Sequence, residues 1–505
     1  MNLRTILFLV SLFVTVITLG MFSAVGVAWY YGEDICQMRL LWCACCCLFL
    51  SILGGVNYYR DGFRPFLAEA GVREGFASVA LAWVAAIVLG ALPFVICAKV
   101  RFVDAVFETA SGFSTTGASV LDLNEMKLPQ CIHYWRCLLN WLGGIGFVMF
   151  ILLVLPLRRG GKQLYNAEVP GLKSASEQLT PRIKTTAMLL LGTYVAWTAL
   201  VMLGYDLLGM GHFDAICHGF TTVSTGGFSP HAESFAYFSP LLQWASIVFM
   251  FVSACNFALH VKVFYKRQFD YWKDEEFLWF LGLTVGSGLV VALFLAQGSG
   301  MLKMLNGNEL ARGWELCLRT SLFHIVSMMT TTGYATSDFC YWGVSCLPIL
   351  FLLLMTLGGC AGSTAGGMKI GRGLVLVKQT QSELRRRIAP HVLPDVRISG
   401  GRVEMEVVNQ TMAFLVIYLL TAGICCILLT FLEPGISLST AGSAAISAIS
   451  NVGPGFGKLS PSYTWGWMCG CSKLLLAFTM VAGRLELYTV FVVLMPRFWR
   501  IKTYR

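Results

Sequence analysis

Apolar stretches long enough to cross a membrane recur along the whole of this 505-residue chain. A helix of about 20 apolar residues spans a hydrocarbon core of about 30 Å. Apolar residues make up 56% of the sequence and charged residues only 13%, which indicates a polytopic membrane protein of the all-α class. We predict ten spans, at 5–31, 38–57, 76–99, 131–156, 183–209, 238–264, 276–297, 343–377, 408–432 and 464–496.

Four shorter and less apolar runs lie between these spans, near 104–115, 213–224, 318–331 and 438–450. They are too short to cross the bilayer, so we interpret them as re-entrant segments. Backbone that is not helical at membrane depth is tolerated only when protein buries it or when it lines a wet cavity. The four runs are therefore predicted to be buried in the protein or to line a wet cavity.

The Lys and Arg residues indicate the orientation of the chain. Ten spans place both termini on one side of the membrane. With the termini inside, 26 of the 37 Lys and Arg face the cytoplasm, ten face outside and Arg484 lies in a span. Cytoplasmic loops normally carry this excess. We predict a multi-pass protein of the cell inner (cytoplasmic) membrane, in contact with lipid, with both termini cytoplasmic.

Each short run ends in a hydroxyl-rich turn that contains glycine. The turns read "GFSTTGAS", "TTVSTGGF", "MMTTTGYA" and "AISNVGPG". The order of span, short run, turn and span thus repeats four times. We predict two N-terminal transmembrane helices in 1–75 and four pseudo-symmetric helix–pore-helix–helix repeats around one pore, at 76–182, 183–275, 276–402 and 403–505.

The residue types of these turns suit a dehydrated monovalent cation. Rings of backbone carbonyls can replace the hydration shell of such an ion. Glycine adopts the positive φ that aligned carbonyls require, and a short helix that ends at the cavity directs its negative end at a cation. Small residues also occur where membrane helices pack closely, but four recurrences favour an ion filter.

Other classes of function lack their sequence signatures. Neither a Walker loop, H-E-x-x-H nor G-x-S-x-G occurs, and no Cys/His spacing matches a zinc site. We therefore expect no enzyme, no organic cofactor on this chain and no nucleic-acid partner. We interpret His218 and His324, which fall in the short runs, as packing residues.

Six motifs carry a family resemblance: "ASGFSTTGASV", "NWLGGIGF", "TTVSTGGFS", "SMMTTTGYATSDF", "GGCAGSTAGGMKI" and "GRLELYTVFVVL". In this order they resemble the Trk/Ktr/HKT superfamily of potassium transporters, and the two additional N-terminal spans resemble its bacterial Trk branch. The resemblance implies K⁺ uptake, a homodimer and a cytosolic nucleotide-binding regulatory subunit of the TrkA type.

The resemblance also implies the residues of a K⁺ filter. Glycine at the first filter position, rather than serine, implies selectivity for K⁺ over Na⁺. The fourth turn, "SNVGPG", lacks the threonine pair of the others. The implied filter residues are Thr115, Thr116, Gly117, Ser224, Thr225, Gly226, Thr331, Thr332, Gly333, Asn451, Val452 and Gly453.

A second glycine-rich segment, from Gly358 to Gly373, interrupts the eighth predicted span. Glycine at this density breaks a helix, and a broken helix at membrane depth should line a cavity. The resemblance implies an intramembrane gate below the filter. The implied gate residues are Gly362, Ser363, Thr364, Gly366, Gly367, Lys369 and Arg484.

Structural interpretations of the same residues remain open. The glycines could serve a tight helix crossing, and Arg484 could form a structural ion pair, for example with Glu486. An arginine inside a membrane is costly, which favours a functional role. We also expect Lys473 to brace the filter rim through an acidic residue such as Glu108.

Two related functions remain as alternatives. The chain could be a Na⁺-coupled or Na⁺-conducting member of the superfamily, or the K⁺-binding subunit of an ATP-driven pump. The basic stretches 157–184 and 372–402 could dock the regulatory subunit or could reflect topology alone.

Overall fold

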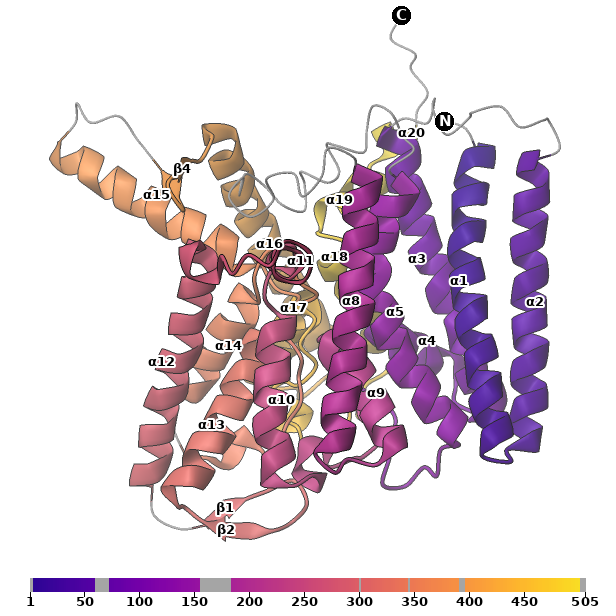
Figure 1. The fold of residues 1–505 in the computed structure, drawn as a ribbon, viewed down its shortest axis with the longest axis horizontal. Helices are drawn as coiled ribbons and strands as arrows, with labels where there is room; N and C mark the ends of the chain where they lie inside the picture. The colour runs from indigo at the N-terminus through magenta and orange to yellow at the C-terminus, as the bar shows by residue number, and fades with distance from the viewer. Residues whose placement is uncertain are drawn as a thin grey trace, which may run out of the picture.

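The computed structural model describes residues 3–59, 72–154, 183–298, 301–343, 346–389 and 396–499. These residues form a bundle of helices with two short hairpins at its ends (Figure 1). Strand β1 (Met301–Lys303) pairs antiparallel with β2 (Glu309–Ala311), and β3 (Arg397–Ile398) with β4 (Gly401–Arg402). We call the end that carries β1 and β2 the outer end, following the predicted topology.

Two N-terminal helices, α1 (Leu3–Tyr30) and α2 (Asp34–Tyr59), form an antiparallel pair at one side of the bundle (Figure 1). Hydroxyls join them, since Thr15 Oγ1 lies 2.6 Å from Ser51 Oγ and Ser51 Oγ donates to the Ser11 carbonyl at 2.9 Å. More than half of α1 is buried against the bundle, whereas most of α2 is exposed.

Four units follow, and each has the order long helix, short helix, turn and second helix, as the sequence predicts. The short helices begin and end close to the predicted re-entrant runs. The long first helices are α3 (Val72–Cys97), α8 (Ile183–Leu207), α12 (Glu275–Gln297) and α16 (Met405–Leu432). The short helices are α4 (Phe102–Phe113), α9 (His212–Val223), α13 (Trp314–Met329) and α17 (Leu438–Ser450). The predicted unit boundary at 75/76 falls within α3.

The second helices differ between the units. In the first unit, α5 (Gln130–Val154) is continuous, but the others are broken. The broken pairs are α10 (Pro240–Ser253) with α11 (Phe257–Lys266), α14 (Leu347–Leu357) with α15 (Ile370–Ile388), and α18 (Gly470–Arg484) with α19 (Tyr488–Leu494), followed by α20 (Pro496–Trp499).

Six described helices are long and apolar enough to cross a membrane, and counting two bent pairs as spans gives eight. The bends are 94° between α10 and α11 and 116° between α18 and α19, and the sequence predicted neither. The predicted span 343–377 is wrong as a single helix, because residues 358–369 interrupt it, as the glycines in it indicated.

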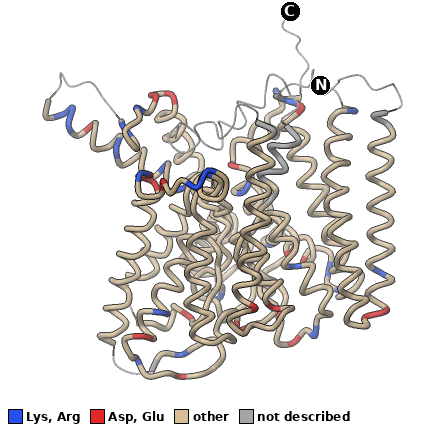
Figure 2. The backbone as a smooth tube through the Cα atoms, in the orientation of Figure 1, with Lys and Arg blue, Asp and Glu red and all other residues tan. Residues whose placement is uncertain are grey.

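The outer surface of the bundle is apolar along the helices. On α16, for example, Leu419, Leu420, Ile424, Ile427 and Phe431 are all exposed. Charged residues concentrate toward the two ends of the bundle (Figure 2). An exposed apolar belt of this extent is the surface that lipid covers.

Glycines allow the second helices to pass directly beneath the short helices. A Cβ at Gly143 in α5 would collide with the backbone carbonyl of Phe113 at the end of α4. A Cβ at Gly483 in α18 would collide in the same way with the carbonyl of Ile449 in α17. The close crossing therefore repeats in the first and fourth units.

We expect Gly143→Ala to lower the thermal stability of the purified protein, because a backbone carbonyl cannot move aside as a flexible side chain can. Overpacking of this kind costs about 1–3 kcal/mol. Gly146→Ala on the same helix is the control. Its Cβ would meet only the Trp83 ring, at 3.4 Å, and alanine favours a helix. An equal melting temperature for the two variants in detergent would contradict the crossing.

Candidate functional site

The four turns after the short helices share one backbone conformation. A left-handed residue comes first in each turn, with φ between 53° and 57°: Thr115, Thr225, Thr331 and Asn451. Two residues later stands a glycine with φ between 76° and 107°: Gly117, Gly227, Gly333 and Gly453. The divergent fourth turn, with asparagine in the left-handed position, thus has the same conformation as the others.

One backbone hydrogen bond closes each turn onto its helix. The donors Thr116 N, Gly226 N, Thr332 N and Val452 N reach the carbonyls of Ser111, Thr221, Ser327 and Ser447 at 2.8, 2.8, 2.9 and 3.0 Å. This bond and the left-handed residue define a Schellman ending of a helix. It satisfies a carbonyl at the end of each short helix and turns the chain sharply away from the helix axis.

The four turns contact each other in a closed ring. A Cβ at Gly117 would collide with the carbonyl oxygen of Gly226, and one at Gly227 with that of Thr332. A Cβ at Gly333 would collide with the carbonyl of Val452, and one at Gly453 with that of Thr116. We call these four glycines and four carbonyls the filter ring, after the ion filter predicted from the sequence. Each unit contacts the next, and the fourth contacts the first.

The ring corrects the register of the second turn. Gly227, not Gly226, corresponds to Gly117, and Gly226 occupies the position of Thr116 and supplies its carbonyl. Ser224 caps the C-terminus of α9 one residue before the turn. Two consecutive glycines concealed this register in the sequence. The structure reveals it because the left-handed residue Thr225 precedes Gly227 by two positions, as Thr115 precedes Gly117.

Side chains of the short helices fix the chain on the outer side of the ring. Glu108 Oε2 accepts from Val120 N at 3.1 Å, and Ser443 Oγ accepts from Phe456 N at 2.9 Å. His324 Nε2 lies 3.4 Å from Thr336 N and 2.9 Å from the Ser337 carbonyl. The backbone donors occupy the same position after each ring glycine.

The second unit has Pro230 at the position of this donor and thus no N–H. There His218 Nε2 lies 3.1 Å from Ser229 Oγ instead. The two histidines, which we interpreted as packing residues, are therefore hydrogen-bonded supports of the turns. Both are fully buried.

A buried ion pair joins the first and second turns. Arg136 Nε donates to Glu108 Oε1 at 2.8 Å, and both side chains are at most 2% exposed. Arg136 also donates to the Ser229 carbonyl at 3.2 Å and lies 4.5 Å from the centre of the Phe228 ring. The fixed guanidinium thus binds the chain that follows Gly227 to the short helix of the first unit.

The expected pairing of Lys473 with Glu108 is wrong. Lys473 Nζ donates instead to Asp104 Oδ1 at 2.5 Å and to the Gly466 carbonyl at 2.9 Å. Asp104 lies one turn before Glu108 on α4, so Lys473 braces the same helix closer to the surface. The basic partner of Glu108, Arg136, lies in the predicted span 131–156, where an arginine is costly, so its position was a signal of such a role.

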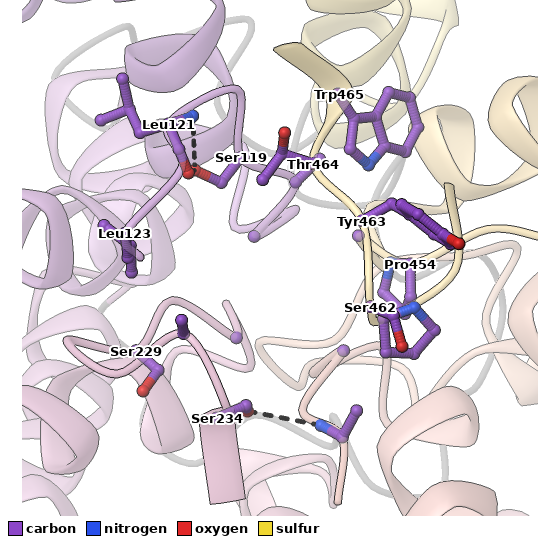
Figure 3. Close-up of a pocket in the computed structure, with 18 of the residues that line it drawn as sticks. Ser119, Leu121, Leu123, Ser229, Ser234, Pro454, Ser462, Tyr463, Thr464 and Trp465 are labelled. Carbon is purple, nitrogen blue, oxygen red and sulfur yellow. Dashed lines mark hydrogen bonds between the residues drawn. The ribbon is translucent and has the colours of Figure 1, made fainter. Parts of the chain in front are cut away.

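A cavity of about 610 Å³ opens above the filter ring. All four ring glycines line it, together with polar and aromatic side chains of the outer loops. Figure 3 labels Ser119, Ser229, Ser234, Pro454, Tyr463, Thr464 and Trp465 among its walls. Ser119 supports this wall through its contact with Leu121 N at 3.1 Å. The ring is therefore the floor of a wide vestibule lined by both polar and apolar side chains.

The segment between α14 and α15, residues 358–369, lies against the other side of the ring, and we call it the intramembrane loop. Thr364 Oγ1 donates to the Val223 carbonyl at 2.9 Å. Gly366 N donates to Thr331 Oγ1 at 2.6 Å, and Gly367 N to the Ser450 carbonyl at 2.9 Å. The loop thus contacts the ends of three short helices directly.

The remaining predicted gate residues shape this loop. Gly362 and Gly367 have φ of 69° and 73°, which glycine adopts without strain. The Gly362 carbonyl accepts from Phe257 N at 3.1 Å. Lys369 donates to the carbonyls of Ser363 and Ala365, so its ammonium holds the loop in a compact fold.

Arg484 contacts the tip of the loop from the fourth unit. Its Nη1 donates to the Thr364 carbonyl at 2.6 Å, and its Nη2 to the Gly143 carbonyl at 3.3 Å. Glu486, the suggested partner of Arg484, forms an ion pair with Arg372 at the start of α15. Two charged contacts therefore join the loop region to the break between α18 and α19.

Several buried oxygens beside the ring have no protein partner in the described part of the chain. They are Thr115 Oγ1, Asn140 Oδ1 and Asn451 Oδ1. Buried polar atoms are normally paired, so unpaired ones need an explanation such as a water or an ion. The ring itself, with four backbone carbonyls and no acidic side chain in its turns, suits a weakly hydrated cation.

Comparison with known proteins identifies the family of the chain. A family model described as TrkH, cation transport protein, matches residues 45–501. The Trk system potassium uptake protein TrkH of Vibrio parahaemolyticus is 34% identical over 99% of this chain and 100% of its own length. TrkG of Escherichia coli K12, also called a Trk system potassium uptake protein, is 33% identical over 99% of both chains.

The crystal structure of the potassium transporter TrkH from Vibrio parahaemolyticus matches the fold with a TM-score of 0.84 at 32% identity, over 99% of this chain and 100% of that chain. The predicted all-α membrane fold and the predicted family are thereby confirmed. The chain belongs to the TrkH family of cation transport proteins.

Proposed function

We propose that this chain takes up K⁺ through the filter ring and the vestibule above it. The observation that carries the proposal is the closed contact of four glycines with four carbonyls of neighbouring units. A ring of this kind surrounds a dehydrated ion with oxygens, which one or two turns cannot do. The relatives are named for potassium uptake, and this supports K⁺ as the ion.

Selectivity for K⁺ over Na⁺ would depend on the positions of the ring carbonyls. The Schellman bonds, the contacts of the short-helix side chains and the Arg136–Glu108 pair restrain these positions from both sides. A restrained ring resists contraction around a smaller ion. In the first turn, Gly117 also leaves room for the carbonyl of Gly226, whereas a serine would displace it.

The intramembrane loop and Arg484 would form the gate. The loop contacts the inner side of three short helices, so an ion leaving the ring must pass it. Arg484 brings a positive charge to the loop tip, where it would repel a cation in a site of low dielectric constant. Opening would therefore require the Arg484 contacts with Thr364 and Gly143 to break.

The family to which the chain belongs also supports an inference about its assembly. We infer a homodimer in the cell inner membrane with both termini cytoplasmic, regulated by a nucleotide-binding subunit of the TrkA type. Lys and Arg along α15 and α11, at the end opposite β1 and β2, offer a basic docking surface (Figure 2). The other predicted docking stretch, 157–184, lies outside the described residues except for its last two.

We expect Gly117→Ser to reduce the preference for K⁺ over Na⁺ about tenfold, which corresponds to ~1.4 kcal/mol. The added side chain would push the Gly226 carbonyl out of the ring. Gly117 also has a φ of 77°, which serine adopts only with strain. The measurement is ⁸⁶Rb⁺ uptake into K⁺-loaded proteoliposomes with Na⁺ as competitor.

Gly209→Ser is the matched control for this experiment. Gly209 also has positive φ, at 94°, but an added Cβ would meet no atom within 4 Å. Unchanged selectivity in Gly117→Ser would contradict the filter assignment. Wild-type uptake that Na⁺ competes for fully would favour a Na⁺-conducting member, and uptake that requires an ATPase partner would favour a pump subunit.

We expect Arg484→Ala to raise Rb⁺ flux without a regulatory partner about tenfold, because removal of two hydrogen bonds and one charge frees the loop tip. Lys266→Ala, which removes an exposed positive charge at the end of α11, is the control. Reduced flux through correctly folded Arg484→Ala would mean that the arginine supports the pore and does not close it.

A further inference from the structure

Glu276 is a buried carboxylate at the base of the intramembrane loop that the filter and gate do not account for. It lies in the first turn of α12, the first helix of the third unit, and only 2% of it is exposed. Its Oε1 accepts from Ala361 N at 2.6 Å and from Gly371 N at 3.0 Å. One oxygen thus binds the beginning of the loop and the start of the helix after it.

The two donors, Ala361 N and Gly371 N, lie where the two ends of the loop meet, and we call this region the neck of the loop. Ile370 N donates to the Gly359 carbonyl at 3.0 Å, which brings the two ends of the loop together. Cys360 N donates to the Ala254 carbonyl at 3.0 Å, at the break between α10 and α11. The neck is therefore bound to the second unit through backbone and to α12 through Glu276, while the tip contacts the ends of three short helices.

The electrostatics of the Glu276 contact favour a fixed neck. Gly371 lies in the first turn of α15, where backbone N–H groups have no partner within the helix and the dipole is positive. A carboxylate is the side chain that such a helix end prefers. Removing Glu276 would leave two buried donors unpaired, at Ala361 and Gly371.

We propose that Glu276 is a positioning residue for the gate. Its carboxylate holds the neck of the intramembrane loop, so that the tip stays under the filter ring until the Arg484 contacts break. This inference rests on the proposed function of the loop as a gate. It assigns the closed position of the loop to Glu276 of α12. No described hydrogen bond joins Glu276 to the ring or to Arg484.

The test compares Glu276→Ala with Glu276→Gln in the full chain. Alanine removes the acceptor, so partner-free Rb⁺ flux into proteoliposomes should rise at least about tenfold, which corresponds to ~1.4 kcal/mol. Glutamine retains an acceptor oxygen at the same reach and should restore flux to within about twofold of wild type. Thr284→Ala is the control, since Thr284 is buried on the same helix and, among the described residues, its hydroxyl donates to the Phe280 carbonyl within that helix.

Hydrogen exchange of the backbone amides provides a second readout that needs no transport. Peptides that cover residues 359–371 should exchange faster in Glu276→Ala than in wild type, Glu276→Gln or Thr284→Ala. A role in overall stability alone would speed exchange across α12 in both alanine variants and would not raise flux. If Glu276→Ala does not fold, Glu276→Leu, which is of similar size and lacks an acceptor, replaces it.

Unchanged flux and unchanged exchange in Glu276→Ala, or an increase that glutamine does not reverse, would overturn the inference. These results would leave the proposed function intact if wild type remained selective for Rb⁺ over Na⁺. Wild type without selective transport would instead refute the proposed function. In that case the exchange rates would still decide whether Glu276 holds the neck of the loop.

Discussion

The contact between a glycine of one unit and a backbone carbonyl of the next determines how this chain is arranged. Four such contacts close the filter ring, and any side chain at the four glycines would open it. The rest of the inner structure serves this approach. The short helices end in Schellman turns that present the carbonyls, and Gly143 and Gly483 let α5 and α18 pass beneath them.

Pseudo-symmetry in the ring coexists with different surroundings in each unit. Glu108, His218 and His324 stand at one equivalent position of the short helices, yet each reaches the turn through its own chemistry. The fourth unit has Ala444 there, and Ser443 takes over the contact. The backbone shape is thus the same in all units, while different side chains hold it.

Asymmetry increases on the other side of the ring. The third unit contributes the intramembrane loop, and the fourth contributes Arg484 and Glu486 at the break between α18 and α19. Glu276 and the break between α10 and α11 hold the neck of the loop. Under the proposed function, one loop would close a path that all four units line. The movement of this loop would depend on contacts that come from the other units.

The sequence by itself determined the helical membrane fold, the four repeats and the positions of most turn residues, because apolar length and glycine-rich turns are local properties. It also indicated the break at Gly358, since glycine disfavours a helix wherever it stands. Only the tertiary structure decided the register of Gly227, the partners of Glu108 and Lys473, and the importance of Glu276. Each of these depends on which backbone groups approach from distant parts of the chain, and no local pattern encodes that approach.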